Sequence, residues 1–469
     1  MLRHRFGTRD EEAPPAPSAA PVDAAAPSAP RRPAPPPMPE PVLLPPALDA
    51  VRQRVHQRLV DEIDQQRLAA MTPEAARRAL RDEALAILAT QQQQGLGDHR
   101  AAIIEAIVDD ILGLGPLEPL LRDDSVSEIM VNGPEHVWVE RSGRLSRTAY
   151  RFRDDEHLAR VIERIVSPLG RHVDEASPMV DARLPDGSRV NVVVPPAAPG
   201  GATITLRKFA RQRLTAEDLV RFGTLTQPAS EFLEACVAAE LNVIVSGGTG
   251  TGKTTLLNVL SSFIDESERI VTIEDPLELQ LQQPHVVSLE ARPPGIEGTH
   301  QISQRDLVRN ALRMRPDRVI VGEVRGGEAF DMLQAMNTGH DGSISTVHAN
   351  SPRDAISRIE NMVLMAGLDL PDHAVREQIA SAIQLVVQIR RLPDGSRRVT
   401  YITEVAGMEG PVITLQDLFT FDPNAQTEDG GRGTLVATGL QPHFVDRFER
   451  NGLPFPAHLL RSGRWDRPA

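Results

Sequence analysis

The strongest structural signal in the sequence lies between Asn242 and Asn258 and reads Asn242-Val243-Ile244-Val245-Ser246-Gly247-Gly248-Thr249-Gly250-Thr251-Gly252-Lys253-Thr254-Thr255-Leu256-Leu257-Asn258. It has the pattern of an apolar strand, a glycine-rich loop and the first turns of a helix, and it fits G-x-x-x-x-G-K-S/T in the required context. Glycines let the backbone bend so that consecutive N–H groups point inward, and the helix directs the positive end of its dipole to the same space. The sequence therefore predicts a phosphate-binding loop (P-loop) made of Gly247, Gly248, Thr249, Gly250, Thr251, Gly252, Lys253, Thr254 and Thr255.

Two side chains of this loop have expected roles in holding a nucleotide. We expect the ammonium group of Lys253 to reach the β and γ phosphates of ATP, and the hydroxyl of Thr254 to ligate a Mg²⁺ ion that bridges these phosphates. The rival interpretation is a glycine-rich turn with a surface lysine. It is disfavoured because the strand, the spacing and the helix all agree with a P-loop.

Carboxylates follow two other predicted strands. Arg269-Ile270-Val271-Thr272-Ile273 leads into Glu274, and Arg318-Val319-Ile320-Val321 leads into Gly322 and Glu323. The carboxyl ends of parallel strands line up beside the P-loop, so we expect Glu323 to polarise the attacking water with help from Glu274. Glu323 is also a candidate Mg²⁺ ligand through water, because Gly322 replaces the aspartate that usually ends this strand. The alternative for both glutamates is a solvated acid at a strand end.

Two histidines, His340 and His348, lie in the polar stretch from Thr338 to Asn350. A histidine near a γ-phosphate acts as a hydrogen-bond donor or sensor without being a metal ligand, so both are candidate site residues. The stretch supplies too few ligands for a zinc site. A structural histidine with satisfied hydrogen bonds is the alternative for each.

The composition limits the function classes. The chain has 469 residues, of which 41% are apolar, but its apolar runs fall short of the roughly 18 residues that span a bilayer. The one cysteine excludes internal disulfides and cysteine-based zinc ribbons. A net charge of −13 has the wrong sign for general binding to nucleic acid, and only 3% aromatic residues leave few platforms for stacking bases. With no secretion signal at the start, we expect a cytoplasmic protein without direct nucleic-acid contact.

The periodicity of the chain predicts five segments in an α/β protein. Residues 1–47 are rich in proline and alanine and are expected to be a disordered tail, and 48–112 have the apolar spacing of a small helical module. Residues 113–210 shift towards a period of two, typical of an α+β domain. Residues 211–421 alternate strands and helices, typical of a largely parallel sheet, and the polar residues 422–469 are expected to form an irregular tail.

Six motifs follow one another along the chain: Gly113–Leu121 (GLGPLEPLL), Glu128–Pro134 (EIMVNGP), Gly247–Thr255, Val271–Glu278, Arg315–Gly326 (RPDRVIVGEVRG) and Thr338–Asn350. Together they resemble the secretion ATPases of type II and type IV systems, and most closely the CpaF-like ATPases of Tad pilus assembly. The resemblance covers roughly Ile111 to Phe421, and the glycine before Glu323 agrees with it. It implies a RecA-like P-loop NTPase domain preceded by a PAS-like α+β domain, with six subunits in a ring and ATP bound between the two domains.

The resemblance also implies that two arginines of the preceding domain, Arg189 and Arg207, reach the phosphates. An arginine at a transferring phosphate is worth roughly 10³ to 10⁵ in rate. Without the resemblance, either arginine is equally well a surface charge.

The expected function is that of a hexameric motor whose ATP hydrolysis powers pilus assembly or protein secretion. We expect it to associate with the inner membrane face through a platform protein. The lone cysteine excludes the four-cysteine zinc element that many type II secretion ATPases carry. Three alternatives stay open: a DNA-handling type IV secretion ATPase, a pilus-retraction motor, and a nucleotide-gated scaffold with little turnover.

Overall fold

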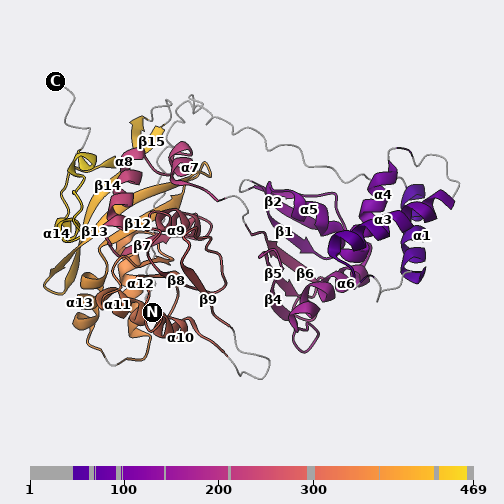
Figure 1. The fold of residues 1–469 in the computed structure, drawn as a ribbon, viewed down its shortest axis with the longest axis horizontal. Helices are drawn as coiled ribbons and strands as arrows, with labels where there is room; N and C mark the ends of the chain where they lie inside the picture. Colours follow the sequence, from indigo (N-terminus) through magenta and orange to yellow (C-terminus); the bar gives the residue numbers. More distant parts are fainter. Residues whose placement is uncertain are drawn as a thin grey trace, which may run out of the picture. The chain divides into compact units, whose positions relative to one another are not determined.

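The computed structural model describes residues 46–62, 68, 70–90, 97, 99–141, 144–209, 213–292, 301–368, 370–426 and 432–461. The predicted tail, residues 1–47, lies outside this description except for its last two residues, which begin the first helix. The chain divides into two compact units (Figure 1). The N-terminal unit runs to Ala182 and includes Asn191–Leu206, and the C-terminal unit comprises Arg183–Val190 and the chain from Arg207 onward.

The N-terminal unit begins with a three-helix module, α1 (Pro46–Glu62), α3 (Pro73–Thr90) and α4 (His99–Leu112). The apolar residues that recur at helical spacing are its core, and Val51, Val55, Leu59, Leu80, Ile103 and Ile107 are at most 1% exposed. The α3 helix begins where the sequence indicates, because the Thr72 hydroxyl accepts a hydrogen bond from the N–H of Ala75 and Pro73 occupies the first position.

A six-stranded sheet with short helices completes this unit, although the strand-end residues Arg183, Arg189, Val190 and Arg207 group with the C-terminal unit. Its strand order is β3-β2-β1-β6-β5-β4, and β2 pairs antiparallel with both β1 and β3. The elements are η1 (Gly115–Leu117), α5 (Glu118–Arg122), β1 (Val126–Asn132), β2 (Val137–Arg141), β3 (Arg144–Arg147), α6 (Asp155–Val166), η2 (Ser167–Leu169), β4 (Met179–Arg183), β5 (Arg189–Val193) and β6 (Thr203–Arg207). Alternating residues of β2 are buried, as the period of two predicts, and β1 follows the same pattern after an irregularity between Val126 and Glu128.

A nine-stranded sheet forms the C-terminal unit, in the order β15-β14-β13-β12-β7-β11-β10-β8-β9. The six strands from β12 to β9 are parallel, and β13, β14 and β15 extend the sheet antiparallel. The strands are β7 (Val243–Gly247), β8 (Ile270–Glu274), β9 (Val286–Glu290), β10 (Arg318–Val324), β11 (Ile344–Val347), β12 (Leu385–Arg391), β13 (Arg397–Glu409), β14 (Val412–Gln426) and β15 (Arg432–Ala437).

Helices cover both faces of this sheet (Figure 1). The helices are α7 (Ala216–Arg221), α8 (Gln227–Ala238), α9 (Lys253–Ser261), α10 (Gln304–Ala311), α11 (Glu328–Asn337), α12 (Pro352–Leu364), α13 (Asp372–Ala382) and α14 (Val445–Arg450). Successive residues of β7 enter two different cores: Val243 and Val245 pack with α8 and α9, whereas Ile244 packs with α11, α12 and α13. This three-layer arrangement is the α/β fold that the alternation of strands and helices predicts.

The prediction of an irregular tail after Phe421 was wrong. β14 continues past this residue to Gln426, and β15 pairs with it antiparallel. The chain then forms α14 and the short helix η3 (Ala457–Leu460). Phe444, Phe448 and Leu460 are buried in the same core as α8. A few well-spaced apolar residues thus anchor a segment whose average composition is polar.

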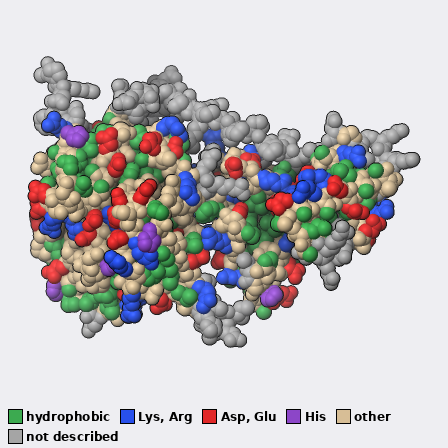
Figure 2. Space-filling model, in the orientation of Figure 1, with side chains coloured by type: hydrophobic (Ala, Val, Ile, Leu, Met, Phe, Trp, Pro, Cys, Tyr) green, Lys and Arg blue, Asp and Glu red, His purple; other side chains and the backbone are tan. Residues whose placement is uncertain are grey.

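Charged side chains of both signs are interspersed with apolar ones on the face of the C-terminal unit drawn in Figure 2. On this face, the acidic side chains that contribute to the net charge of −13 do not form one patch. Among the residues that the structure describes, no helix combines the length and the apolar character needed to cross a membrane.

Candidate functional site

The predicted P-loop lies at the carboxyl end of the central strand β7. Gly247 ends the strand, residues 248–252 form the loop, and Lys253, Thr254 and Thr255 open α9. Gly250 and Gly252 have φ angles of +69° and +99°, a region that side chains other than glycine's disfavour. The loop therefore reverses at these two glycines, and α9 begins directly behind it.

Gly247 is required for close packing. A Cβ on this residue would come within 2.6 Å of the carbonyl oxygen of Ile389 on β12, and within 2.6 Å of Thr251 Oγ1. The parallel ladder between β7 and β12 aligns Gly247 with Ile389, so the first glycine of the motif allows the loop to leave the sheet without a clash.

Lys253 folds back over the loop. Its Nζ donates a hydrogen bond to the carbonyl oxygen of Gly248 at 3.1 Å, and Thr251 Oγ1 donates to the same oxygen at 2.9 Å. Burial lowers the pKa of Lys253, and the carboxylate of Glu323 opposes this shift. A buried ammonium beside glycine amides at a helix N-terminus has the chemistry that a polyphosphate requires.

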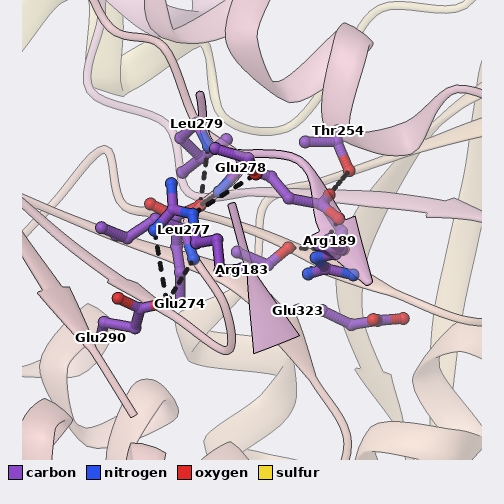
Figure 3. A network of polar contacts seen from close by, with 12 residues as sticks. Arg183, Arg189, Thr254, Glu274, Leu277, Glu278, Leu279, Glu290 and Glu323 are labelled. Atoms are coloured by element: carbon purple, nitrogen blue, oxygen red, sulfur yellow. Dashed lines mark hydrogen bonds and ion pairs between the residues drawn. The ribbon is translucent and has the colours of Figure 1, made fainter. Parts of the chain in front are cut away.

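The Glu274 carboxylate shapes the loop that follows β8 (Figure 3). It accepts hydrogen bonds from Thr272 Oγ1 at 3.2 Å and from the backbone N–H groups of Glu278 and Leu279 at 2.6 and 2.7 Å. Burial raises the pKa of Glu274, and these hydrogen bonds oppose the shift. The expectation that Glu274 helps to polarise water does not fit this geometry, because both of its oxygens already hold the protein's own groups.

Glu278 bridges the P-loop helix to an arginine (Figure 3). Its Oε2 accepts a hydrogen bond from Thr254 Oγ1 at 3.1 Å, and its Oε1 lies 2.9 Å from Arg189 Nη2. Burial lowers the pKa of Arg189, with Glu278 opposing the shift and with Arg207 and Arg325 adding to it. Both predicted arginines belong to the C-terminal unit, which includes residues 183–190 and Arg207. Arg189 pairs with Glu278, and Arg207 is close enough to lower the pKa of Arg189.

Glu323, on β10, is held between a basic side chain and a histidine. Arg325 donates to Glu323 Oε2 from Nε at 2.8 Å and from Nη2 at 2.5 Å. His348 Nε2 lies 3.0 Å from Glu323 Oε1, without the alignment of a hydrogen bond. Burial lowers the pKa of His348, and the nearby Lys253 adds to this shift. Lys253, Glu323 and His348 therefore form one electrostatic group at the carboxyl edge of the sheet.

His340 lies outside this group, so its assignment to the site was wrong. It precedes β11, whereas His348 follows it, and β11 runs parallel to the P-loop strand β7. The two histidines consequently lie at opposite edges of the sheet, about 13 Å apart along the strand at 3.3 Å per residue. The backbone carbonyl of His340 accepts a hydrogen bond from Ser343 Oγ at 2.8 Å, which stabilises the turn before β11.

The arrangement also fits Mg²⁺. The ion is usually held by one or two carboxylates together with phosphate oxygens rather than by a complete protein cage. The described part of the chain contains no group of three or more histidine, cysteine or acidic side chains placed to hold a metal. Thr254 Oγ1 and the Glu278 carboxylate, already in contact, are the donors that this chain would offer beside the phosphates.

Three residues at the site were not among the candidates chosen from the sequence. Glu278 lies in the same motif as Glu274, and Arg325 in the same motif as Glu323. Their closeness in sequence to these acids could have identified them as site residues. Arg397, at the start of β13, donates from Nε to the carbonyl oxygen of Gly250 at 3.1 Å. No local pattern connects Arg397 to the P-loop, because only the strand order of the folded sheet brings them together.

The chain matches a known protein family. The profile of the family described as "Type II/IV secretion system protein" matches residues 110–420. The chain belongs to this family. It is an NTPase of the type II/IV secretion family, and nucleotide binding follows from that membership.

Two relatives from the type II/IV secretion family carry more specific names. A putative conjugal transfer protein of Mycobacterium tuberculosis is 39% identical over 326 residues, which are 68% of this chain and 92% of that protein. The type IV secretion system protein PtlH of Bordetella pertussis is 38% identical over 313 residues, which are 61% of this chain and 91% of that protein. These similarities make the chain a secretion- or conjugation-type ATPase. The finer CpaF-like subtype has no counterpart in these names.

Among solved structures, the VirB11 ATPase of the Brucella suis type IV secretion system is 30% identical, with a TM-score of 0.34. The match covers 62% of this chain and 95% of that one. The pilus retraction motor PilT with bound ADP is 24% identical over 61% of this chain and 80% of that one, with a TM-score of 0.46.

Proposed function

We propose that this chain is an ATP-hydrolysing motor of a type IV secretion or conjugation machine. The observation that carries the proposal is the buried Lys253 ammonium inside the P-loop beside the Glu323 carboxylate on β10, which opposes the lowering of the Lys253 pKa by burial. A cation that holds phosphates and a carboxylate that orients water beside them are the minimum that phosphoryl transfer to water needs.

The chain's own groups have distinct parts in this reaction. The loop amides and Lys253 bind the phosphates, and Glu323 orients the attacking water and accepts its proton. Arg325 and His348 fix the direction of the Glu323 carboxylate. Thr254 and Glu278 would hold Mg²⁺, which would supply positive charge beside the phosphates. Arg189 and Arg207 are the proposed arginines that stabilise the transferring phosphate.

The type of cargo is inferred from the relatives. The names of the two relatives above refer to conjugal transfer and to type IV secretion, so substrate export of that kind has more support than pilus assembly. We further propose a homohexameric ring of RecA-like domains with a PAS-like partner domain. It would act from the cytoplasm through a platform protein at the inner membrane.

Steady-state phosphate release tests the catalytic assignment. Lys253→Ala should abolish turnover and weaken ATP binding, whereas Glu323→Gln should bind ATP normally and lose turnover. Wild-type turnover in the Lys253→Ala protein would refute the site. If the wild-type protein binds ATP but releases phosphate no faster than Glu323→Gln, the chain is a nucleotide-gated scaffold instead of a motor.

A deletion strain tests the cargo. Complementation with the wild-type chain but not with Lys253→Ala should restore protein export or DNA transfer between cells. Restoration of surface pili alone would favour the pilus-assembly or retraction alternative.

A further inference from the structure

The hairpin of β12 and β13 brings an arginine to the P-loop from a distant part of the chain. β12 runs parallel to β7 and aligns Ile389 with Gly247, so the end of β12 lies beside the start of the loop. The chain then turns, and β13 begins at Arg397, which pairs with Arg391 across the hairpin. The sheet order therefore places Arg397 next to the loop.

Arg397 contacts the two P-loop glycines that have positive φ angles, Gly250 and Gly252. Its Nε donates a hydrogen bond to the carbonyl oxygen of Gly250 at 3.1 Å. Its aliphatic stem covers Gly252, since a Cβ built on that glycine would lie 3.3 Å from Arg397 Cδ. One exposed side chain thus contacts the two positions at which the loop reverses.

The hydrogen bond to Gly250 also orients an amide that faces the phosphates. The carbonyl of Gly250 and the N–H of Thr251 belong to one planar trans peptide group and point in opposite directions. An arginine that holds this carbonyl on the outer side therefore keeps the Thr251 N–H turned to the inner side, where a P-loop binds its anion. Glycine is otherwise the residue with the largest backbone freedom, so such a restraint matters most at these positions.

We propose that Arg397 is a positioning residue for nucleotide binding, which holds the P-loop in its phosphate-binding form before the nucleotide arrives. The inference rests on the proposed function and adds a residue to it. A restraint of this kind lowers the ordering cost of binding and leaves the chemical step unchanged. Arg397 contacts the outer side of the loop, whereas the Glu323 carboxylate is held by Arg325 and His348.

Arg397→Ala is the direct test, with Arg390→Ala as the matched control. Arg390 is an exposed arginine of the same hairpin, paired in register with Arg398, so its removal changes charge equally. We expect Arg397→Ala to raise the Kd for ATP, measured by calorimetry, and the KM about tenfold, the effect of one charge-assisted hydrogen bond. The kcat at saturating ATP should stay within about twofold. Arg397→Lys should recover part of the affinity, because an ammonium can still donate to the Gly250 carbonyl.

Hydrogen exchange gives a readout that does not depend on activity. Without nucleotide, the backbone amide hydrogens of residues 249–252 should exchange faster in Arg397→Ala than in wild type. In Arg390→Ala they should exchange at the wild-type rate. Equal Kd values and equal exchange in the two alanine variants would overturn the inference. So would a fall in kcat with unchanged KM.

Lys253→Ala, measured beside them, separates the two proposals. If Lys253→Ala loses ATP binding while Arg397→Ala does not, only the role of Arg397 fails. If Lys253→Ala binds ATP like wild type, the proposed function fails.

Discussion

Gly322 lies directly against the side chain of Glu274. A Cβ on Gly322 would come within 3.0 Å of Glu274 Cγ, and Glu274 is 2% exposed, with its carboxylate bonded to two backbone N–H groups of the next loop. Glu274 therefore has little room to move aside. This contact explains why glycine stands before Glu323, where P-loop NTPases usually have aspartate.

Gly322→Ala should consequently destabilise the protein. Overpacking of a filled interior costs about 1–3 kcal/mol, and the displacement of Glu274 should also lower turnover through the loop that carries Glu278. Urea unfolding and phosphate release measure the two effects. Gly200→Ala is the control, because a Cβ there meets nothing within 4 Å. Equal stability of the two variants would contradict the packing argument.

Thr254→Val should remove the Mg²⁺ dependence of nucleotide binding. The variant keeps the shape of the side chain but loses the hydroxyl that contacts Glu278. Calorimetry with ATP should show similar affinity in the presence of a chelator for wild type and variant, and a Mg²⁺-dependent gain only in wild type. Thr254→Ser retains the hydroxyl and should behave like wild type. An undiminished Mg²⁺ effect in Thr254→Val would exclude this threonine as a ligand.

The N-terminal unit should lose stability as the pH falls below about 6.5. Burial lowers the pKa of His157 from 6.5 to about 4, and Arg153 and Arg160 add to the shift; burial likewise lowers the pKa of His56 to about 4. Between these values the unfolded chain binds protons that the folded unit does not, so the free energy of unfolding decreases as pH falls through this window. Above pH 6.5 these histidines should contribute no pH dependence.

Trp138, on β2, allows this unit to be followed by fluorescence in a Trp465→Phe background. His157→Gln should flatten the decline between pH 6.5 and 4, because one of the two proton-linked side chains is gone. His136→Gln makes the same change on an exposed residue and should leave the decline intact. An unchanged slope in His157→Gln would show that other groups cause the acid sensitivity.

Phe448→Ala should destabilise the C-terminal unit by about 3–5 kcal/mol, the usual cost of removing a buried phenylalanine. The side chain is fully buried, and its ring lies 5.2 Å from that of Phe455 and 6.4 Å from that of Phe444, between centroids. Denaturant unfolding measures the loss. Leu440→Ala, on a side chain that is 48% exposed in the same C-terminal stretch, should cost far less.

Local patterns predicted much of the fold. The helical spacing of Val51, Val55 and Leu59, and the strand, loop and helix around Gly247, are each contained in a short stretch, so their form follows from nearby residues. The C-terminal segment was missed because its anchors, Phe444 and Phe448, are few among polar neighbours. Their burial depends on a surface offered by α8, which lies far away in the sequence.

The site was predictable where one motif carries both position and chemistry. Lys253 follows β7, Glu323 lies near the end of β10, and both are at the same edge of the sheet. His340 was wrongly assigned because the motif does not show where β11 begins and ends. Without those bounds, the sequence does not tell which histidine lies at the P-loop edge of the sheet. Arg397 was not predicted because a single exposed arginine belongs to no sequence motif. Its contact with Gly250 depends on the pairing of β12 with β7 in the folded sheet.

The position of β7 in the sheet has a mechanical consequence. It is the middle strand of nine and is hydrogen-bonded on both sides to parallel neighbours, β11 and β12. A load applied to the nucleotide-holding end of this strand is shared by two ladders of backbone hydrogen bonds, so we expect the strand itself to yield little. We therefore expect movements that accompany hydrolysis in the connections after β8 and β10, which carry Glu278 and Arg325, rather than in β7 itself.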